Sequence, residues 1–327
     1  MAIKRGVSFY SYQQSYYKNE NSLEDLIRIT AQTVGAKGIE LLYEQTPVGA
    51  YPHPTDADVD RWKDWMDKYN TKSVCMDLFL DYMLYKGRVS SLKEQVQMME
   101  NGIRLAARLG FPIVRVLCTV RKEVFEASIP IAENYNVKMG LEVHSPMTLR
   151  SRWINEYVEM FDKSGSKHVG LIPDFGIFQK RPAKKMLDNA LAAGADPKIL
   201  EYVVKACENG VRSKQIAVEI AKMGAGETET AVAMSFIRTF FSEPEWLKDV
   251  AKYLIHFHAK FYDMNVQCED TCIDYETPLA VLKEIGFDGY LCSEFEGQSL
   301  YLGDEEPDEV EQVRRQHVML KKLIGEK

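Results

Sequence analysis

Short runs of apolar, β-branched residues alternate along the whole chain with longer segments of helical periodicity. Short apolar runs are typical of buried strands, whereas apolar positions spaced three or four apart indicate amphipathic helices. Eight runs predict strands, at residues 3–12, 37–43, 71–80, 111–120, 137–145, 168–176, 254–262 and 289–296. Because strands and helices alternate so regularly, the pattern predicts parallel βαβ units.

The segments between the predicted strands carry the start signals of helices. Ser22 with Asp25 and Thr55 with Asp58 have the spacing of capping boxes, and an apolar periodic run follows each pair. The segment from residue 148 onward predicts a helix with a core-facing stripe, because four apolar side chains recur at i, i+4 spacing. These are Leu149, Trp153, Tyr157 and Phe161.

Eight βα units in 327 residues predict the α/β class and a (β/α)8 TIM barrel that forms a single domain over residues 1–327. A doubly wound open sheet is disfavoured, since no Gly-rich phosphate loop follows the first strand. The connection 177–253 between strands six and seven is much longer than the others. It predicts three or four helices, at about 183–192, 196–208, 213–223 and 228–240. A long insertion at this position is expected to form a lid or a subunit contact.

Composition narrows the choice of partners and compartment. A net charge of −7 disfavours nucleic acid and anionic membranes as main partners. The six scattered cysteines suit buried thiols in a reducing cytosol, and the lone Cys268–Cys272 pair is a poor zinc knuckle. No apolar run approaches the roughly 20 residues that a membrane span needs, and no signal peptide precedes the first strand. We therefore expect a cytoplasmic protein.

Four polar residues lie at the C-terminal ends of apolar runs: Glu142, Asp174, His258 and Glu294. Since the sites of TIM barrels lie at that end of the strands, we expect these side chains to converge. Buried carboxylates need a cation, and three carboxylates with one imidazole favour Mn²⁺, with Mg²⁺, Co²⁺ or Fe²⁺ also compatible. The alternative is that the four groups face solvent and form surface ion pairs.

Side-chain alternation along a strand extends this set, because residues two apart share a face. His144 then lies beside the first glutamate, where it could act as the base that removes a proton next to a polarised carbonyl, or could orient the metal site. Lys260 shares a face with His256 and could stabilise negative charge or pair with Glu296. Glu296 is also a candidate for substrate contact, and alternation alone does not choose between Glu294 and Glu296 as the fourth ligand.

Other polar and aromatic residues near the expected upper rim are candidates for substrate contact. Glu40 ends the second strand and could bind a sugar hydroxyl, or could be a buried acid paired with a neighbour in strand one or three. His53 lies on a loop at the same end. Tyr10 and Phe79 could stack on a sugar or an aglycone, or could belong to the core. His317 shares a face with apolar residues and predicts helix packing.

The segments GVSFYSYQ, GAKGIEL, GLEVHSP, IPDFG, HFHAKFYDM and GYLCSEFEG resemble the xylose isomerase-like superfamily of sugar isomerases and epimerases. The resemblance covers nearly the whole chain and implies the metal ligands Glu142, Asp174, His258 and Glu294. Ketose 3-epimerases of this superfamily use their two metal-bound glutamates as acid and base, which here would be Glu142 and Glu294. They also carry a second histidine where this chain has Ile177. With His144 close by, that departure disfavours simple 3-epimerisation.

GLEVHSP, PDFGIF and HAKFYDM, together with the long insertion, look most like the catalytic α subunit of bacterial C-glycoside deglycosidases. This resemblance implies Mn²⁺, a small β subunit as partner in an oligomer, and a 3-oxo-C-glucoside of flavonoid type as substrate. The implied activity is a metal-dependent carbon–carbon lyase. His144 would remove the C2 proton, and the aglycone would leave C1 by β-elimination.

Three other functions compete with this interpretation. The runner-up is an isomerase, epimerase or dehydratase that acts on free keto-sugars or inososes through a metal-bound enediolate. An apurinic endonuclease is disfavoured, since six histidines and a charge of −7 do not suit a His-rich trinuclear zinc site on DNA. A non-catalytic barrel is disfavoured by the complete ligand set. The sequence does not fix the aglycone, the preference for C- or O-glycosides, or the metal.

Overall fold

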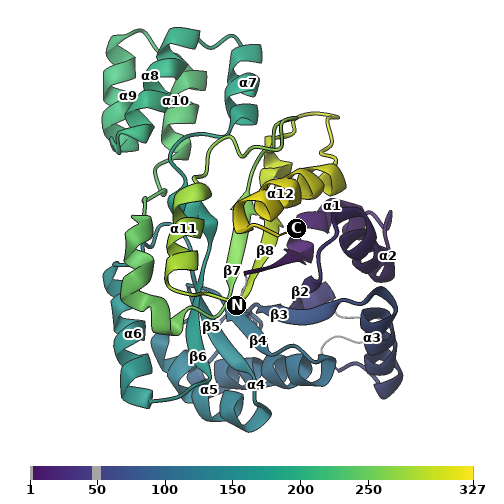
Figure 1. Ribbon diagram of the computed structural model, residues 1–327. Helices are drawn as coiled ribbons and strands as arrows, with labels where there is room; N and C mark the ends of the chain where they lie inside the picture. The colour runs from purple at the N-terminus through teal and green to yellow at the C-terminus, as the bar shows by residue number, and fades with distance from the viewer. Residues whose placement is uncertain (1–2, 46–52, 327) are drawn as a thin grey trace.

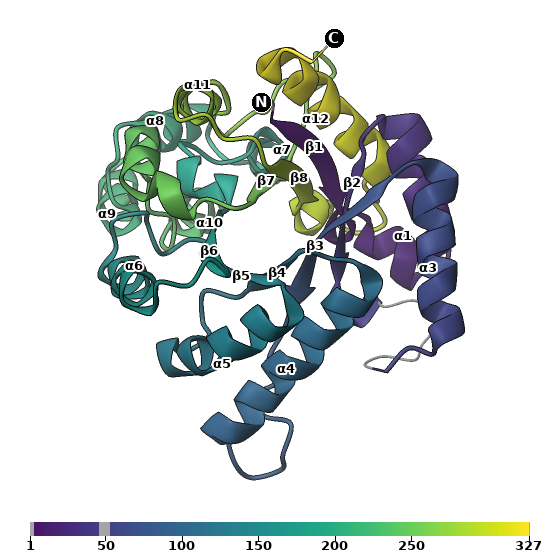
Figure 2. The same ribbon diagram turned by 60° about the horizontal axis from the view of Figure 1, so that its bottom comes forward.

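The computed structural model describes residues 3–45 and 53–326. Its eight strands form one parallel sheet in the order β6-β5-β4-β3-β2-β1-β8-β7. Figure 2 shows the strands arranged as a ring with helices around it. The strands are β1 Lys4–Ser8, β2 Gly38–Leu42, β3 Lys72–Leu78, β4 Ile113–Val116, β5 Lys138–Val143, β6 Val169–Pro173, β7 Phe257–Phe261 and β8 Tyr290–Phe295.

The ring closes between the β6 and β7 segments through two isolated parallel bridges, Leu171 with Leu254 and Asp174 with His258. The amide of Ile255 also donates to the carbonyl of Leu171 at 3.2 Å. Eight parallel strands in a nearly closed ring confirm the predicted TIM barrel, and the open doubly wound sheet is excluded.

Helices connect successive strands and cover the outside of the barrel (Figure 1). The predicted capping boxes of Ser22 with Asp25 and of Thr55 with Asp58 are both present. The α-helices are α1 Gln13–Tyr17, α2 Leu23–Arg28, α3 Asp56–Tyr69, α4 Leu92–Leu109, α5 Lys122–Tyr135, α6 Arg152–Ser164, α7 Lys184–Ala192, α8 Pro197–Glu208, α9 Ser213–Lys222, α10 Glu227–Ser235, α11 Glu276–Glu284 and α12 Glu309–Ile324. The described part of the chain has no helix long and apolar enough to cross a membrane.

Short irregular helices complete the chain. They are the 3-10 helices η1 Phe9–Tyr12, η3 Tyr43–Gln45, η5 Phe175–Phe178, η6 Pro244–Tyr253 and η7 Gly297–Leu300, and the π-helix η2 Ile29–Val34. Two of them shorten strands that the sequence pattern predicts to be longer. The Ser8 hydroxyl accepts the amide of Tyr10 at 3.4 Å and starts η1, so the strand predicted at 3–12 ends at Ser8. Asp174 accepts the amide of Gly176 at 2.6 Å and starts η5, so the strand predicted at 168–176 ends at Pro173. Side-chain hydrogen bonds to the backbone thus end both strands earlier than the apolar pattern predicts.

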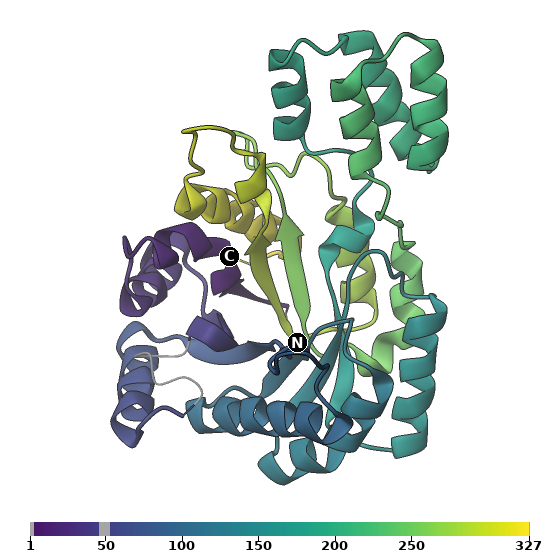
Figure 3. The same ribbon diagram turned by 180° about the vertical axis from the view of Figure 1, so that it is seen from behind.

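The connection between β6 and β7 contains four α-helices, α7 to α10, that stand apart from the ring of outer helices (Figures 1 and 3). They pack on a hydrophobic cluster of their own, which includes Ile199, Val203, Ile216, Ile220 and Val232. The helix predicted at 228–240 is shorter than expected and ends at Ser235. A 3-10 helix, η6, then leads the chain back toward the barrel.

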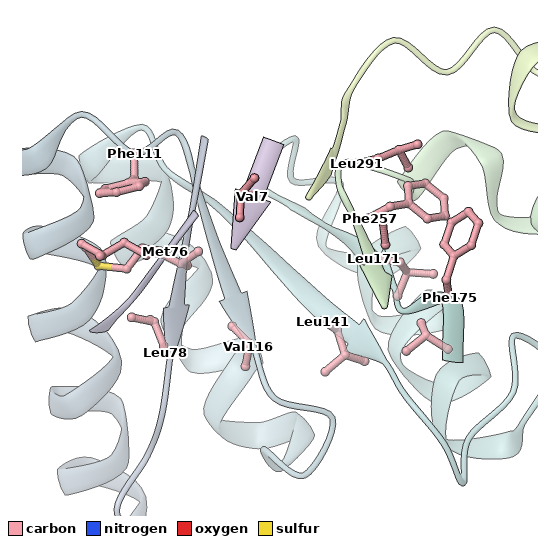
Figure 4. Packing of buried hydrophobic residues seen from close by; sticks show 14 of the residues in the cluster. Val7, Met76, Leu78, Phe111, Val116, Leu141, Leu171, Phe175, Phe257 and Leu291 are labelled. Carbon is pink, nitrogen blue, oxygen red and sulfur yellow. The ribbon is translucent and has the colours of Figure 1, made fainter. Parts of the chain in front are cut away.

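The main apolar core lies between the sheet and the outer helices (Figure 4). Leu141 and Val143 flank Glu142 on β5, and both are fully buried; Phe257 and Ala259 flank His258 on β7 in the same way. Because side chains alternate along a strand, the apolar residues point outward to the helices and the polar residues point inward. The fold therefore collects polar groups inside the barrel.

Candidate metal and active site

Four buried side chains converge at the C-terminal ends of β5, β6, β7 and β8. Glu142, Asp174, His258 and Glu294 each offer one ligand atom, and these atoms all lie within 4.8 Å of one another. All four residues are at most 4% exposed. The alternative of surface ion pairs is therefore excluded by their burial.

Local backbone structure holds Asp174 in this group. Its amide donates to the carbonyl of Val143 at 3.1 Å, and its Oδ1 accepts the amide of Gly176 at 2.6 Å. A side chain at position 176 would place its Cβ 2.7 Å from that same Oδ1, so the turn requires glycine. With Oδ1 fixed in this way, Oδ2 is directed toward the other ligands.

The imidazole of His258 has two distinct sides. Its Nδ1 lies 3.1 Å from Glu142 Oε1 and 3.4 Å from Glu294 Oε1. Its Nε2 lies 3.0 Å from Glu40 Oε1 and 3.9 Å from Asp77 Oδ1. Nδ1 is thus the nitrogen that faces the candidate ligands, and Nε2 faces the interior of the barrel.

The residues present fit a divalent cation. Asp174 Oδ2 and Glu294 Oε2 are buried and have no hydrogen-bond partner within residues 3–45 and 53–326, although buried ionised carboxylates rarely lack one. Burial raises the pKa of Asp174 to about 7, and the charge of Glu294 adds to this rise, whereas the charge of Lys260 opposes it. Burial also acts to raise the pKa of Glu142, but the charges of Arg115 and His258 hold that pKa well below its usual range. Oxygen-rich ligands with one imidazole suit Mn²⁺ and similar divalent ions.

The ammonium group of Lys260 lies among three carboxylates of the candidate site. Its Nζ lies 3.1 Å from Asp174 Oδ2, 3.5 Å from Glu294 Oε2 and 3.0 Å from Glu296 Oε1, and the residue is 1% exposed. Burial lowers the pKa of a lysine, but these carboxylates hold the pKa of Lys260 well above its usual value. Glu294 lies in the ligand group, whereas the side chain of Glu296 is 28% exposed and pairs with Lys260.

His144 lies directly after β5 and contacts the same lysine. Its Nδ1 is 2.6 Å from the carbonyl of Ser145, and its Nε2 is 2.8 Å from Lys260 Nζ. A carbonyl only accepts hydrogen bonds, so Nδ1 carries the proton and Nε2 presents a lone pair to the ammonium group. His144 is therefore a neutral imidazole whose basic nitrogen is directed at the site.

The remaining candidates lie at different depths. Tyr10 is at the rim, where burial, followed by the charges of Glu296 and Glu294, raises its pKa to about 12. Phe79 is 39% exposed, and its ring centre lies 5.0 Å from the guanidinium group of Arg115. His53 is exposed on the segment before α3, and its substrate contact stays a prediction.

Glu40 is fully buried and contacts His256 and His258. Glu40 is therefore a buried acid, but its ion-pair partners are His258 on β7 and His256 just before β7, and not a residue of strand one or three. His317 is also buried, and it bonds Arg5 and Ser293 instead of only packing between helices.

Three polar residues of the site were missed in the sequence. Arg115 on β4 lies 3.1 Å from Asp77 on β3 and 4.0 Å from Glu142. The sequence does mark both residues, since Arg115 in IVRV and Asp77 in CMDL are single charged residues inside apolar runs. Tyr262 follows β7, and its burial together with the charges of Glu296 and Asp174 raises its pKa, which Lys260 opposes.

The sequence of this chain matches a family of known proteins. The sequence profile described as xylose isomerase-like TIM barrel matches residues 29–323. The chain belongs to this family. A solved D-psicose 3-epimerase shares the fold, with a TM-score of 0.59 and 11% identity over 98% of this chain and 99% of that one.

Within the xylose isomerase-like family, the chain is similar to alpha subunits of deglycosidases. The chain is 28% identical to the 3'-dehydrocarminate deglycosidase alpha subunit of Microbacterium sp., over 100% of this chain and 97% of the relative. It is 26% identical to a C-glycoside deglycosidase alpha subunit of Arthrobacter globiformis, over 99% of this chain and 93% of the relative. The relatives are thus enzymes, and their names as alpha subunits imply partner subunits.

Proposed function

We propose that this chain is the catalytic subunit of a metal-dependent deglycosidase that cleaves the carbon–carbon bond of 3-oxo-C-glucosides. The observation that carries the proposal is the buried group of Glu142, Asp174, His258 and Glu294, with the neutral His144 and Lys260 beside it. The relatives named C-glycoside deglycosidase support the substrate class, and one of them is named for a dehydro-glycoside.

The four ligands would hold a divalent cation, for which we propose Mn²⁺, and the bound cation would polarise the 3-oxo group so that the C2 proton becomes acidic. His144 Nε2 is the base that takes this proton, since its lone pair is directed into the site. Before this step the ammonium group of Lys260 must move away from Nε2. The carboxylate of Glu296, 3.0 Å from Lys260 Nζ, can pair with the ammonium group instead.

Breaking the C2–H bond leaves an electron pair that forms the C1=C2 double bond while the bond from C1 to the aglycone breaks. The aglycone carbon then needs a proton, which Lys260 supplies from its position beside His144. His144 passes the proton that it took from C2 to Lys260, 2.8 Å away. His144 and Lys260 therefore end the reaction in the protonation states in which they began it. The products are a 1,2-unsaturated 3-oxo sugar and the free aglycone.

The rim residues Tyr10, Phe79 and Glu296 would contact the sugar or a flavonoid-sized aglycone. Aromatic rings offer a planar aglycone stacking partners, and Glu296 offers a sugar hydroxyl an acceptor. The names of the relatives support a small second subunit as partner in an oligomer. We propose that helices α7 to α10 form a lid or a contact for that subunit.

Release of an aglycone tests this function. The purified chain, alone and together with a small β subunit, is incubated with a flavonoid 3-oxo-C-glucoside in the presence of Mn²⁺ or of EDTA. We expect release of the aglycone that depends on Mn²⁺ and is lost in His144→Ala. Absence of release in every mixture would contradict the proposal. Turnover of a free keto-sugar or inosose would instead favour an isomerase, epimerase or dehydratase.

A further inference from the structure

Glu40 lies in the barrel interior between two imidazoles. Its Oε2 is 2.5 Å from His256 Nε2, and its Oε1 is 3.0 Å from His258 Nε2. All three side chains are fully buried. Glu40 thus contacts His258 on the side opposite to the candidate ligands Glu142 and Glu294.

The facing atoms of Glu40 and His258 have few other neighbours. Neither Glu40 Oε1 nor His258 Nε2 has a hydrogen-bond partner among the described residues, and the next carboxylate, Asp77, is 3.9 Å from Nε2. A buried N–H group without an acceptor is costly, as is a buried carboxylate oxygen without a donor. Glu40 Oε1, at 3.0 Å, is closer to His258 Nε2 than Asp77 Oδ1 is, so it is the nearer acceptor for a proton on that nitrogen.

Two further contacts hold Glu40 in place. His256 donates from Nε2 to Glu40, while its buried Nδ1 has no hydrogen-bond partner in the described part of the chain. The thiol of Cys292 lies in the same group, with its Sγ within 4.8 Å of the ligand atoms of Glu40 and His256. A Cβ on Gly6 would lie 2.5 Å from that Sγ, so a glycine there leaves the thiol its space.

We propose that Glu40 is the positioning residue of the metal site, which keeps the imidazole proton of His258 on Nε2 and so presents Nδ1 as a lone pair to the cation. The inference rests on the metal site of the proposed function. Carboxylates that accept the second N–H of a ligating histidine fix its tautomer and its ring orientation, and their loss typically weakens metal binding 10- to 100-fold.

A competing assignment is a second metal ion bound by Glu40, His256 and Cys292. The geometry opposes it, because Glu40 Oε2 and His256 Nε2 are in direct hydrogen-bond contact at 2.5 Å and leave no space for an ion between them. The third candidate group, Glu40 with Asp77 and His258, shares His258 with the proposed site, so we expect a single ion per chain.

Metal titration tests the role of Glu40 without any substrate. The affinity and stoichiometry of the full-length chain for Mn²⁺ are measured by electron paramagnetic resonance for wild type, Glu40→Gln and Glu309→Gln. Glu309 is a matched control, since it is a buried carboxylate that accepts the amides of Gln14 and Ser15. We expect one ion per chain, 10- to 100-fold weaker binding in Glu40→Gln, and a change of less than about threefold in Glu309→Gln.

A spectroscopic readout covers the case in which Glu40→Gln does not fold. In the wild-type chain loaded with Zn²⁺ as a diamagnetic probe, ¹⁵N NMR should show His258 protonated at Nε2, with a slowly exchanging, downfield proton. A rapidly exchanging Nε2 proton would overturn the role of Glu40, as would unchanged Mn²⁺ affinity in Glu40→Gln or two ions per chain. Wild type that binds no metal would refute the metal site itself. Metal binding without aglycone release would refute only the deglycosidase.

Discussion

Asp174 and His258 face each other across the seam of the barrel, where an isolated parallel bridge joins the end of β6 to β7. Every other pair of neighbouring strands forms a parallel ladder, with one register shift, between Ile39 and Glu40, in the pair of β2 and β3. Two of the four candidate ligands therefore lie where backbone pairing is weakest. A cation shared by both side chains would tie the two edges of the barrel together.

Metal binding should accordingly stabilise the fold. At a free Mn²⁺ concentration 100 times the dissociation constant, the free energy of unfolding should rise by about 2.7 kcal/mol over that in EDTA. Urea unfolding in the two conditions measures the difference. In the variant His258→Gln, Mn²⁺ should raise the free energy of unfolding much less. An equal rise in that variant would show that the ion binds elsewhere.

His144→Ala should separate chemistry from metal binding. Removing a general base typically lowers kcat 10²- to 10⁴-fold, whereas Mn²⁺ affinity should change little, because His144 lies outside the ligand group. Aglycone release and Mn²⁺ titration measure the two effects on the same sample. Loss of metal would make His144 a ligand, and the base would then be sought at Glu296 or Lys260.

His317 should make the fold sensitive to moderate acid. Burial, together with the guanidinium of Arg5 that donates to Nδ1 at 2.8 Å, lowers the pKa of His317 to about 3. In the unfolded chain the pKa is about 6.5. Between these values the unfolded state binds a proton that the folded state lacks, so stability falls as pH falls.

The loss from this one group should be about 2 kcal/mol between pH 7 and pH 5, at about 1.4 kcal/mol per pH unit below pH 6.5. Urea unfolding at several pH values measures it. His317→Gln should unfold with a pH dependence that is smaller by this amount. An identical pH dependence in the variant would contradict the assignment to His317.

Gly140→Ala should destabilise the barrel by overpacking. A Cβ at this position on β5 would lie 2.5 Å from both Cγ1 and Cδ1 of Ile172 on β6. Such overpacking typically costs about 1–3 kcal/mol, and Ile172→Ala alone costs about 2–5 kcal/mol through the cavity that it leaves. Because the new methyl group would enter that cavity, the double variant should lose less than the sum of the two. Strict additivity in urea unfolding would show that the two positions do not share space.

The sequence determined the architecture of this protein and the choice of its candidate metal ligands. Alternating apolar runs and helical segments predicted eight βα units, and side-chain alternation along β5, β7 and β8 predicted which polar residues share a face. These inferences hold because the period of a strand and the position of TIM-barrel sites depend on local geometry. The strand ends at Ser8 and Pro173 were missed, since side-chain hydrogen bonds of Ser8 and Asp174 to the backbone ended those strands earlier than the apolar pattern predicts.

Only the tertiary structure decided which groups meet inside the barrel. Lys260 meets Asp174, Glu294, Glu296 and His144 at once. Glu40 meets His258 on β7 and His256 just before β7, although Glu40 is far from both in the chain. Such contacts depend on the order and stagger of strands around the ring, which bring β2 and β7 to face each other. Sequence periodicity assigns a residue to a face, whereas closure of the ring sets the distance between charges, and therefore their pairing and protonation.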